Sequence, residues 1–155
     1  MPSLRGGQHK SSENTDDVHR LRSLALCLRP MKTENLTMST ERHKELRART
    51  KAFALRIIRM SQALPRTREA NVLVQQILRS ATGMAANYRA AERSRSKAEF
   101  IAKIGVVLEE ADETVFWLEM LSDSGIVRPA KLQELLSEAT QLVAIFTASR
   151  KTARD

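Results

Sequence analysis

The sequence predicts an all-α protein, an antiparallel up-down-up-down four-helix bundle with a disordered N-terminal extension. Five Gly and four Pro among 155 residues leave long stretches without a helix breaker. In four of these stretches apolar residues recur every three or four positions, the period of a helix with one buried face. A chain of this length buries one core without disulfides or metal. We therefore expect an extension, residues 1–38, and one domain, residues 39–155.

The extension combines Gly, Ser, Asn and Asp with one short apolar run, a composition typical of disorder. Met31 and Met38 stand just before the periodic region, so either is a candidate for the true start in place of Met1. The apolar run Leu24–Leu28 is shorter than the core of a signal peptide, and no stretch approaches the roughly 20 apolar residues that span a bilayer. With Cys27 as the single cysteine, we expect a cytoplasmic protein with no membrane partner.

The first helix is predicted to begin near Ser39, an N-cap candidate, and to end near Ala63, before Pro65. The second is predicted from Thr67 to Ala91. The apolar period assigns buried faces to both helices: Leu46, Thr50, Phe53, Ile57, Met60 and Leu64 on the first, and Leu73, Ile77, Ala81, Met84, Tyr88 and Ala91 on the second.

The third helix is predicted to begin at Ser96, which forms a capping box with Glu99, and to end at Gly125. The fourth is predicted to open near Pro129 and to fray from Arg150 onward. The period again assigns buried faces: Phe100, Ile104, Val107, Ala111, Val115, Leu118 and Leu121 on the third helix, and Leu132, Leu135, Ala139, Leu142 and Phe146 on the fourth. Because the connections are short, consecutive helices must run antiparallel.

The third helix carries more apolar residues than one buried face requires. The additional ones are Ile101, Val106, Phe116, Trp117 and Met120. They indicate either an unusually wide core-facing surface or an interface between subunits, since large exposed apolar patches mark association sites.

Catalytic groups are scarce in the predicted domain. His9, His19 and Cys27 precede it, and His43 lies on an otherwise charged surface of the first helix. No glycine-rich phosphate loop occurs. The acidic run Glu109–Glu113 lacks the Glu-x-x-His motifs of bundle di-metal sites and is interpreted as a partner for Arg or Lys. We expect a protein that is not an enzyme and has no catalytic residue, cofactor or metal.

The second helix interleaves polar residues with its core positions. Gln76, Ser80 and Asn87 lie near one face, with Arg79 beside them. Because burying such groups is costly unless they are hydrogen-bonded, partners are needed, and Glu113 on the third helix is a candidate. The series indicates either a structural polar network that sets helix register or direct contact with a ligand.

Positive charge is concentrated in the first half of the domain, with 14 Lys and Arg against 4 Asp and Glu in residues 39–97, and 6 against 10 in residues 98–155. Arginine clusters can grip phosphates through paired hydrogen bonds, although a solvated turn is also commonly charged. With 4% aromatic residues we expect contact with the backbone of a nucleic acid rather than base stacking. The candidates are Arg89, Arg93, Arg95 and Lys97 around the turn between the second and third helices, and Arg66 and Arg68 at the opposite end.

Six short motifs occur in order: Arg49–Phe53, Leu64–Glu69, Gln76–Ala81, Ala86–Ala91, Arg95–Phe100 and Glu109–Glu113. Together they resemble the bacterial four-helix bundle family named after proteins encoded in 23S rRNA intervening sequences, over about residues 41–148. The resemblance implies a ring-like homopentamer with a role involving RNA. The chain departs from the family pattern after Asn87, where Arg89 makes the turn more basic.

The leading hypothesis is a non-enzymatic homo-oligomer, a pentamer, that binds RNA or DNA electrostatically through a basic surface. The alternative is a scaffold or adaptor that binds another protein and no nucleic acid. Extra apolar residues on the third helix favour the alternative, whereas the basic first half favours the leading hypothesis.

Overall fold

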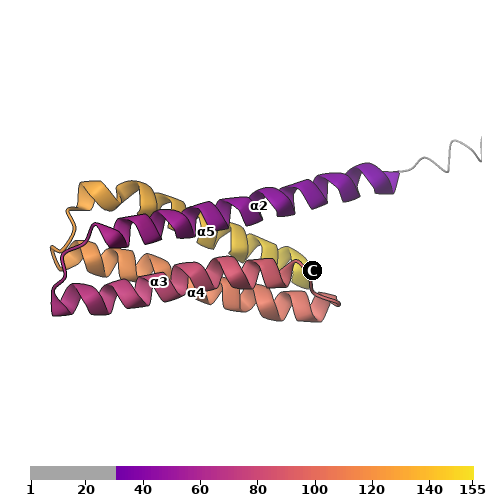
Figure 1. Ribbon diagram of the computed structural model, residues 1–155. Helices are drawn as coiled ribbons and strands as arrows, with labels where there is room; N and C mark the ends of the chain where they lie inside the picture. The colour runs from indigo at the N-terminus through magenta and orange to yellow at the C-terminus, as the bar shows by residue number, and fades with distance from the viewer. Residues whose placement is uncertain (1–30) are drawn as a thin grey trace, which may run out of the picture. The chain divides into compact units, whose positions relative to one another are not determined.

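Four helices make up residues 31–155, the part of the chain that the structure, a computed structural model, describes, with side chains from Thr40 onward (Figure 1). They are α2 (Met31–Gln62), α3 (Arg68–Ala91), α4 (Lys97–Asp123) and α5 (Pro129–Arg154). Residues 40–155 form one compact unit. Most of the predicted extension, residues 1–30, lies outside the described residues.

Consecutive helices run antiparallel, as predicted. α3 packs beside α4, and α4 packs beside α5. α2 completes the bundle because it contacts α3 and α5. His43 Nδ1 lies 3.2 Å from Tyr88 Oη of α3, and the Arg49 guanidinium donates to Gln141 Oε1 of α5 at 2.8 Å. The up-down-up-down four-helix bundle is thereby confirmed.

The caps predicted at Ser96 and Gly125 lie where the sequence places them, and Thr67, expected only near the start of its helix, caps α3. The Thr67 side chain accepts a hydrogen bond from the backbone N–H of Ala70 at 3.2 Å, and Ser96 accepts one from that of Glu99 at 3.1 Å. Gly125 follows α4 with φ +73°, a left-handed conformation that glycine adopts without strain. Pro129 opens α5.

Two predicted boundaries are wrong. α2 begins at Met31, not near Ser39. The prediction relied on apolar period, whereas a formed helix can extend beyond its buried face where no breaker stops it, and neither Gly nor Pro occurs between Pro30 and Pro65. α5 does not fray at Arg150 but stays helical to Arg154. Cations in the last turn favour this, because they interact well with the negative end of the helix dipole.

The predicted apolar faces form the core. Phe53, Ile57, Ile77, Leu118 and Phe146 are fully buried, and the remaining predicted core residues are buried or pack against them. A chain of this kind gains most of its helical stability from such tertiary packing. None of the helices in the described part of the chain is long and apolar enough to cross a membrane.

The additional apolar residues of α4 divide into two groups. Trp117 packs against the core, and Ile101 is half-buried. Val106, Phe116 and Met120 remain exposed. A wide core-facing surface therefore explains part of the excess, and an apolar surface on the outside of α4 remains.

Candidate nucleic-acid interface

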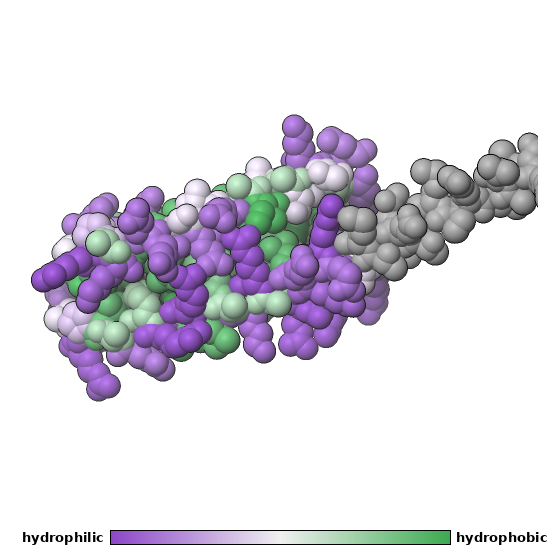
Figure 2. Space-filling model, turned by 90° about the horizontal axis from the view of Figure 1, so that it is seen from above, coloured by the Kyte–Doolittle hydropathy of each residue, from purple (hydrophilic) through white to green (hydrophobic). Residues whose placement is uncertain are grey.

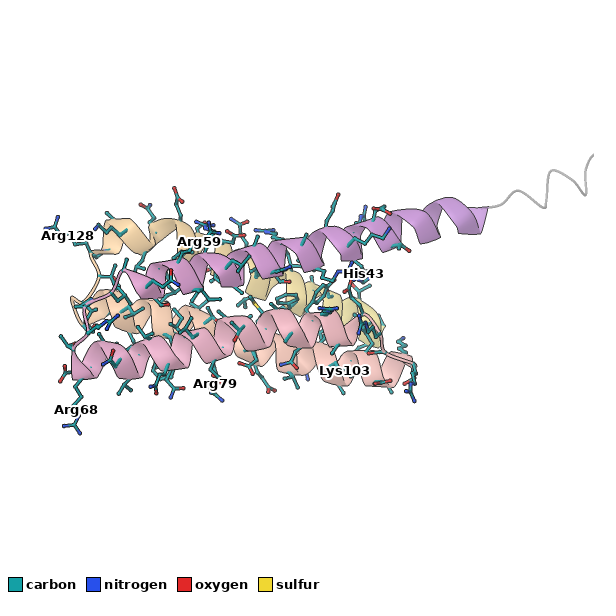
Figure 3. The ribbon with its side chains drawn as sticks, in the orientation of Figure 1. His43, Arg59, Arg68, Arg79, Lys103 and Arg128 are labelled. Carbon is teal, nitrogen blue, oxygen red and sulfur yellow. The ribbon has the colours of Figure 1, made fainter. Side chains whose placement is uncertain are left out.

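Three segments far apart in the sequence meet at one end of the bundle. Residues 40–47 of α2 lie against the end of α3, where Arg47 pairs with Glu92 at 3.5 Å. The end of α5 lies on the start of α4, since a Cβ added to Gly105 would lie 3.4 Å from the Arg150 guanidinium. His43 and Lys103 mark this end in Figure 3. We call residues 40–47, 89–103 and 150–155 the basic end.

The basic end carries all the net charge of the compact unit. Its three segments contain eleven Lys and Arg against five Asp and Glu, whereas the rest of residues 40–155 contains nine of each. In Figure 2 hydrophilic side chains cover this end and also much of the rest of the visible face. Outside the basic end the charges of the compact unit cancel in sum, so the net positive charge corresponds to the excess at this end.

Four of the sequence-predicted residues supply unpaired cations at the basic end. Arg89, Arg93, Arg95 and Lys97 are all exposed. Among the residues that the structure describes, no carboxylate lies within ion-pair distance of their side chains, in contrast to the nearby Lys103, which pairs with Glu99 at 2.7 Å. Their side chains are thus available to a phosphate without breaking an internal pair.

The turn that presents these cations is held by Glu99. Its Oε2 accepts a hydrogen bond from the backbone N–H of Arg95 at 2.8 Å. This differs from the predicted capping box, in which the N–H of Ser96 would donate. The hydrogen bond from Lys103 and then that from the Arg95 N–H lower the pKa of Glu99 below its usual range. Glu99 therefore stays ionised and orders the turn while Lys103 offsets its charge.

Tyr88, the single tyrosine, is not a stacking platform. It is buried beneath the basic end, with its ring centroid 5.5 Å from that of Phe146. Burial, and then the negative charge of Glu92, raise its pKa to about 12. Contact with the sugar-phosphate backbone rather than base stacking remains the mode that this end suits.

The two other predicted binding residues, Arg66 and Arg68, do not join this cluster. Arg66 lies in the α2–α3 connection and Arg68 opens α3, at the end that Arg68 and Arg128 mark in Figure 3. The six candidates therefore fall into a group of four and a group of two. The sequence interpretation missed Arg47 and Arg150, although antiparallel pairing of the predicted helices brings both to the first group.

The predicted polar series forms two separate pairs. Arg79 donates to Glu113 at 3.0 Å on the surface, with the side chains 66% and 45% exposed. Ser80 Oγ lies 3.0 Å from Thr114 Oγ1 in the buried interface of α3 and α4. The side chains of the remaining two, Gln76 and Asn87, are half-buried and form no hydrogen bond with the described part of the chain. Thr114 was not singled out, because threonine at a core position resembles a small apolar residue.

Cations on the α5 side of α2 are engaged within the subunit. Arg56 pairs with both Glu138 and Glu134, the latter at 3.2 Å. Arg49 also reaches Glu138, at 3.4 Å. Arg49, Glu134 and Glu138 line an open polar groove between the two helices. The two arginines hold α2 on α5 and are poor candidates for binding a polyanion.

Glu110 is an unusual carboxylate between α3 and α4. A Cβ on Gly83 would lie only 2.9 Å from its carboxyl carbon, so the missing side chain makes room for it. Its buried Oε2 has no hydrogen-bond partner among the residues that are described. Burial, and then the charge of Glu113, raise the pKa of Glu110.

Replacing Glu110 by Gln should therefore stabilise the protein at pH 7 by up to about 1 kcal/mol, because the uncompensated charge is removed. A carboxylate whose folded-state pKa is raised stabilises the fold at low pH and loses that contribution as the pH rises through the folded-state pKa. Urea denaturation at fixed protein concentration, between pH 4 and pH 8, should show this loss in the wild type and less of it in the variant. Glu45→Gln, an exposed position on α2, is the control. Equal pH dependence in the wild type and Glu110→Gln would contradict the assignment.

Comparison with known proteins shows similarity to a protein family and to solved structures. The family model described as 23S rRNA-intervening sequence protein matches residues 42–148. A crystal structure of a protein of unknown function from the S23 ribosomal protein family of Bacteroides thetaiotaomicron is similar, with a TM-score of 0.65 and 30% sequence identity over 70% of this chain and 97% of that one. No curated protein matches. The chain belongs to the 23S rRNA-intervening sequence protein family.

Proposed function

We propose that this protein is a non-enzymatic homo-oligomer, a pentamer, that binds RNA or DNA through its basic end. One observation carries the proposal. All net positive charge of the compact unit lies at one end of the bundle, where Arg89, Arg93, Arg95 and Lys97 are exposed and unpaired within the described residues. The family's name refers to 23S rRNA, which supports RNA as the first ligand to test, and we propose a cytoplasmic location.

Binding of this kind is electrostatic. Each phosphate that meets a Lys or Arg releases condensed counterions, so affinity falls with salt in proportion to the number of contacts. Assembly strengthens it, because several basic ends contact one strand and each additional contact is intramolecular. A pentamer would therefore bind much more tightly than a single subunit.

Titration of a fluorescently labelled RNA of about 30 nucleotides, and of a duplex DNA of similar length, tests the proposal. If each subunit that binds the nucleic acid contacts four phosphates, each such subunit should contribute about −3 to −4 to the slope of log affinity against log salt concentration. Absence of binding at 50 mM salt, or an affinity unchanged between 50 and 200 mM, would contradict it. Labelled RNA recovered intact after incubation would agree with a binding role and no catalysis.

Binding of another protein is the alternative that a specific observation favours. Val106, Phe116 and Met120 leave apolar surface exposed on α4. A scaffold or adaptor would capture one protein in a pull-down, and nuclease treatment would not release it. Nucleic acid as the main co-purifying component would favour the leading proposal.

A further inference from the structure

Two exposed surfaces of the bundle have an apolar centre and opposite charge. The α2 face consists of Lys51, Ala52, Leu55 and Arg59, and the α4 face consists of Val106, Glu109, Glu113, Phe116 and Met120. Leu55 is 44% exposed and Phe116 is 49% exposed, although both are large apolar side chains. Within the described residues Lys51 and Arg59 form no ion pair, unlike Arg49 and Arg56 on the same helix. On the α4 face, Glu113 already pairs with Arg79 of α3, whereas Glu109 forms no ion pair within the described residues.

The two faces point away from each other. α2 and α4 each pack against both α3 and α5, which places them at diagonally opposite corners of the bundle. One copy can therefore present its α4 face to one neighbour and its α2 face to another. Such a contact between two different surfaces forms a ring where its rotation closes and an open filament where it does not, and the homo-oligomer of the proposed function requires the closed form.

The two faces are also matched in height along the bundle. His43 of α2 lies level with Tyr88 of α3, and Ser80 of α3 lies level with Thr114 of α4. Since Ser80 is eight residues from Tyr88, the position on α2 level with Thr114 is eight residues beyond His43, which is Lys51. α2 and α4 run in the same direction, so the same offset applies along both.

With this offset, apolar side chains of the two faces meet at the centre of the contact, and opposite charges meet on either side of them. Leu55 falls at the height of Leu118, between the exposed Phe116 and Met120. Lys51 falls beside Glu113, one residue from Thr114, and Arg59 falls at the height of Ser122, next to Asp123. Two α4 faces would fit each other poorly, because residues 104–123 contain six Asp and Glu and no Lys or Arg, and like charges across an interface are repulsive.

We propose that the α4 face of one copy docks, in parallel, on the α2 face of the next copy, with Leu55 seated between Phe116 and Met120. The inference rests on the homo-oligomer of the proposed function and names its interface. Because the helices run parallel across the contact, rotation brings every basic end to the same rim of the ring. One rim then offers a repeated set of Arg and Lys to a nucleic acid.

Two single variants and their mixture test the interface by native mass measurement. Leu55→Asp blocks one face and Phe116→Asp blocks the other, so each variant alone should have the 17.5 kDa mass of one subunit. Mixed in equal amounts, they should form a dimer and nothing larger, because only one intact α2 face and one intact α4 face can meet. Ala144→Asp places the same charge on the exposed surface of α5 and should leave the wild-type mass unchanged.

The outcomes separate this inference from the proposed function. A wild type that is a single subunit overturns both. A wild-type oligomer that persists in either variant overturns the interface alone, as do variants that separate but form no mixed dimer. Circular dichroism confirms folding, which the exposure of both positions favours. Leu55→Ser and Phe116→Ser replace any aspartate variant that does not fold.

Discussion

Replacing Phe146 by Ala is expected to destabilise the bundle by about 3–5 kcal/mol, since a fully buried aromatic ring is lost and a cavity remains. The cavity would open beside Tyr88, whose ring lies 5.5 Å from that of Phe146 and whose hydroxyl contacts His43. It would thus lie where α5, α3 and α2 meet. Urea denaturation at fixed protein concentration measures the loss, and Phe146→Leu, which keeps an apolar side chain of similar volume, should cost about 1.5 kcal/mol or less.

The same substitution should be visible at the single tyrosine. Burial is the main cause of the Tyr88 pKa of about 12, so water admitted by Phe146→Ala should lower the pKa toward the ordinary 10.0. In the wild type the raised folded-state pKa means that stability is lost as the pH rises from about 10 toward 12. An alkaline absorbance titration reports phenolate formation directly. A stability within about 1 kcal/mol of wild type, with an unchanged tyrosine titration, would show that Phe146 is not a principal core residue.

The parts of the fold that were predictable from sequence are those that depend on neighbours in the chain. Helix period located the core faces, including Phe53 and Phe146, because apolar residues three or four apart share a side. Ser96 was recognisable as a cap because its side chain bonds a backbone N–H three residues away. Short connections then required antiparallel neighbours.

The candidate site depended on distant residues, and sequence reasoning found only part of it. The turn cations were visible as a cluster, but Arg150 reaches the same end only because α5 returns to α4 at Gly105. Contacts between residues of different helices were equally hard to predict from the sequence. Gly83 and Glu110 fit each other across α3 and α4, and nothing near either residue indicates the other.

The start of α2 could not be predicted from the sequence for a different reason. Apolar period predicts which side of a helix is buried, not where the helix begins, so the residues from Met31 to Met38 were assigned to the extension. In the polar series of α3, the sequence likewise did not show which residues are buried. Ser80 and Arg79 are adjacent in sequence, yet one is buried against Thr114 and the other is exposed and pairs with Glu113.

Replacing Arg89, Arg93, Arg95 and Lys97 together by Gln should reduce affinity for nucleic acid about a thousandfold at low salt, if each lost phosphate contact is worth about 1 kcal/mol. The salt dependence should weaken as well, by about 0.9 in slope for each duplex phosphate released and about 0.7 for each single-stranded one. Fluorescence anisotropy across a salt series measures both quantities. All four positions are exposed, so the core should be unaffected.

The opposite end of the bundle supplies a matched control. Arg66, Arg68, Arg128 and Lys131 are also exposed, and their replacement by Gln removes the same formal charge. If binding depends on the local excess at the basic end, this control should lose less than about tenfold, because long-range attraction between exposed charges is screened beyond roughly 10 Å at 0.1 M salt. Equal losses in the two variants would mean that affinity follows net charge rather than a site. A larger loss in the control would place the site around Arg66 and Arg68 instead.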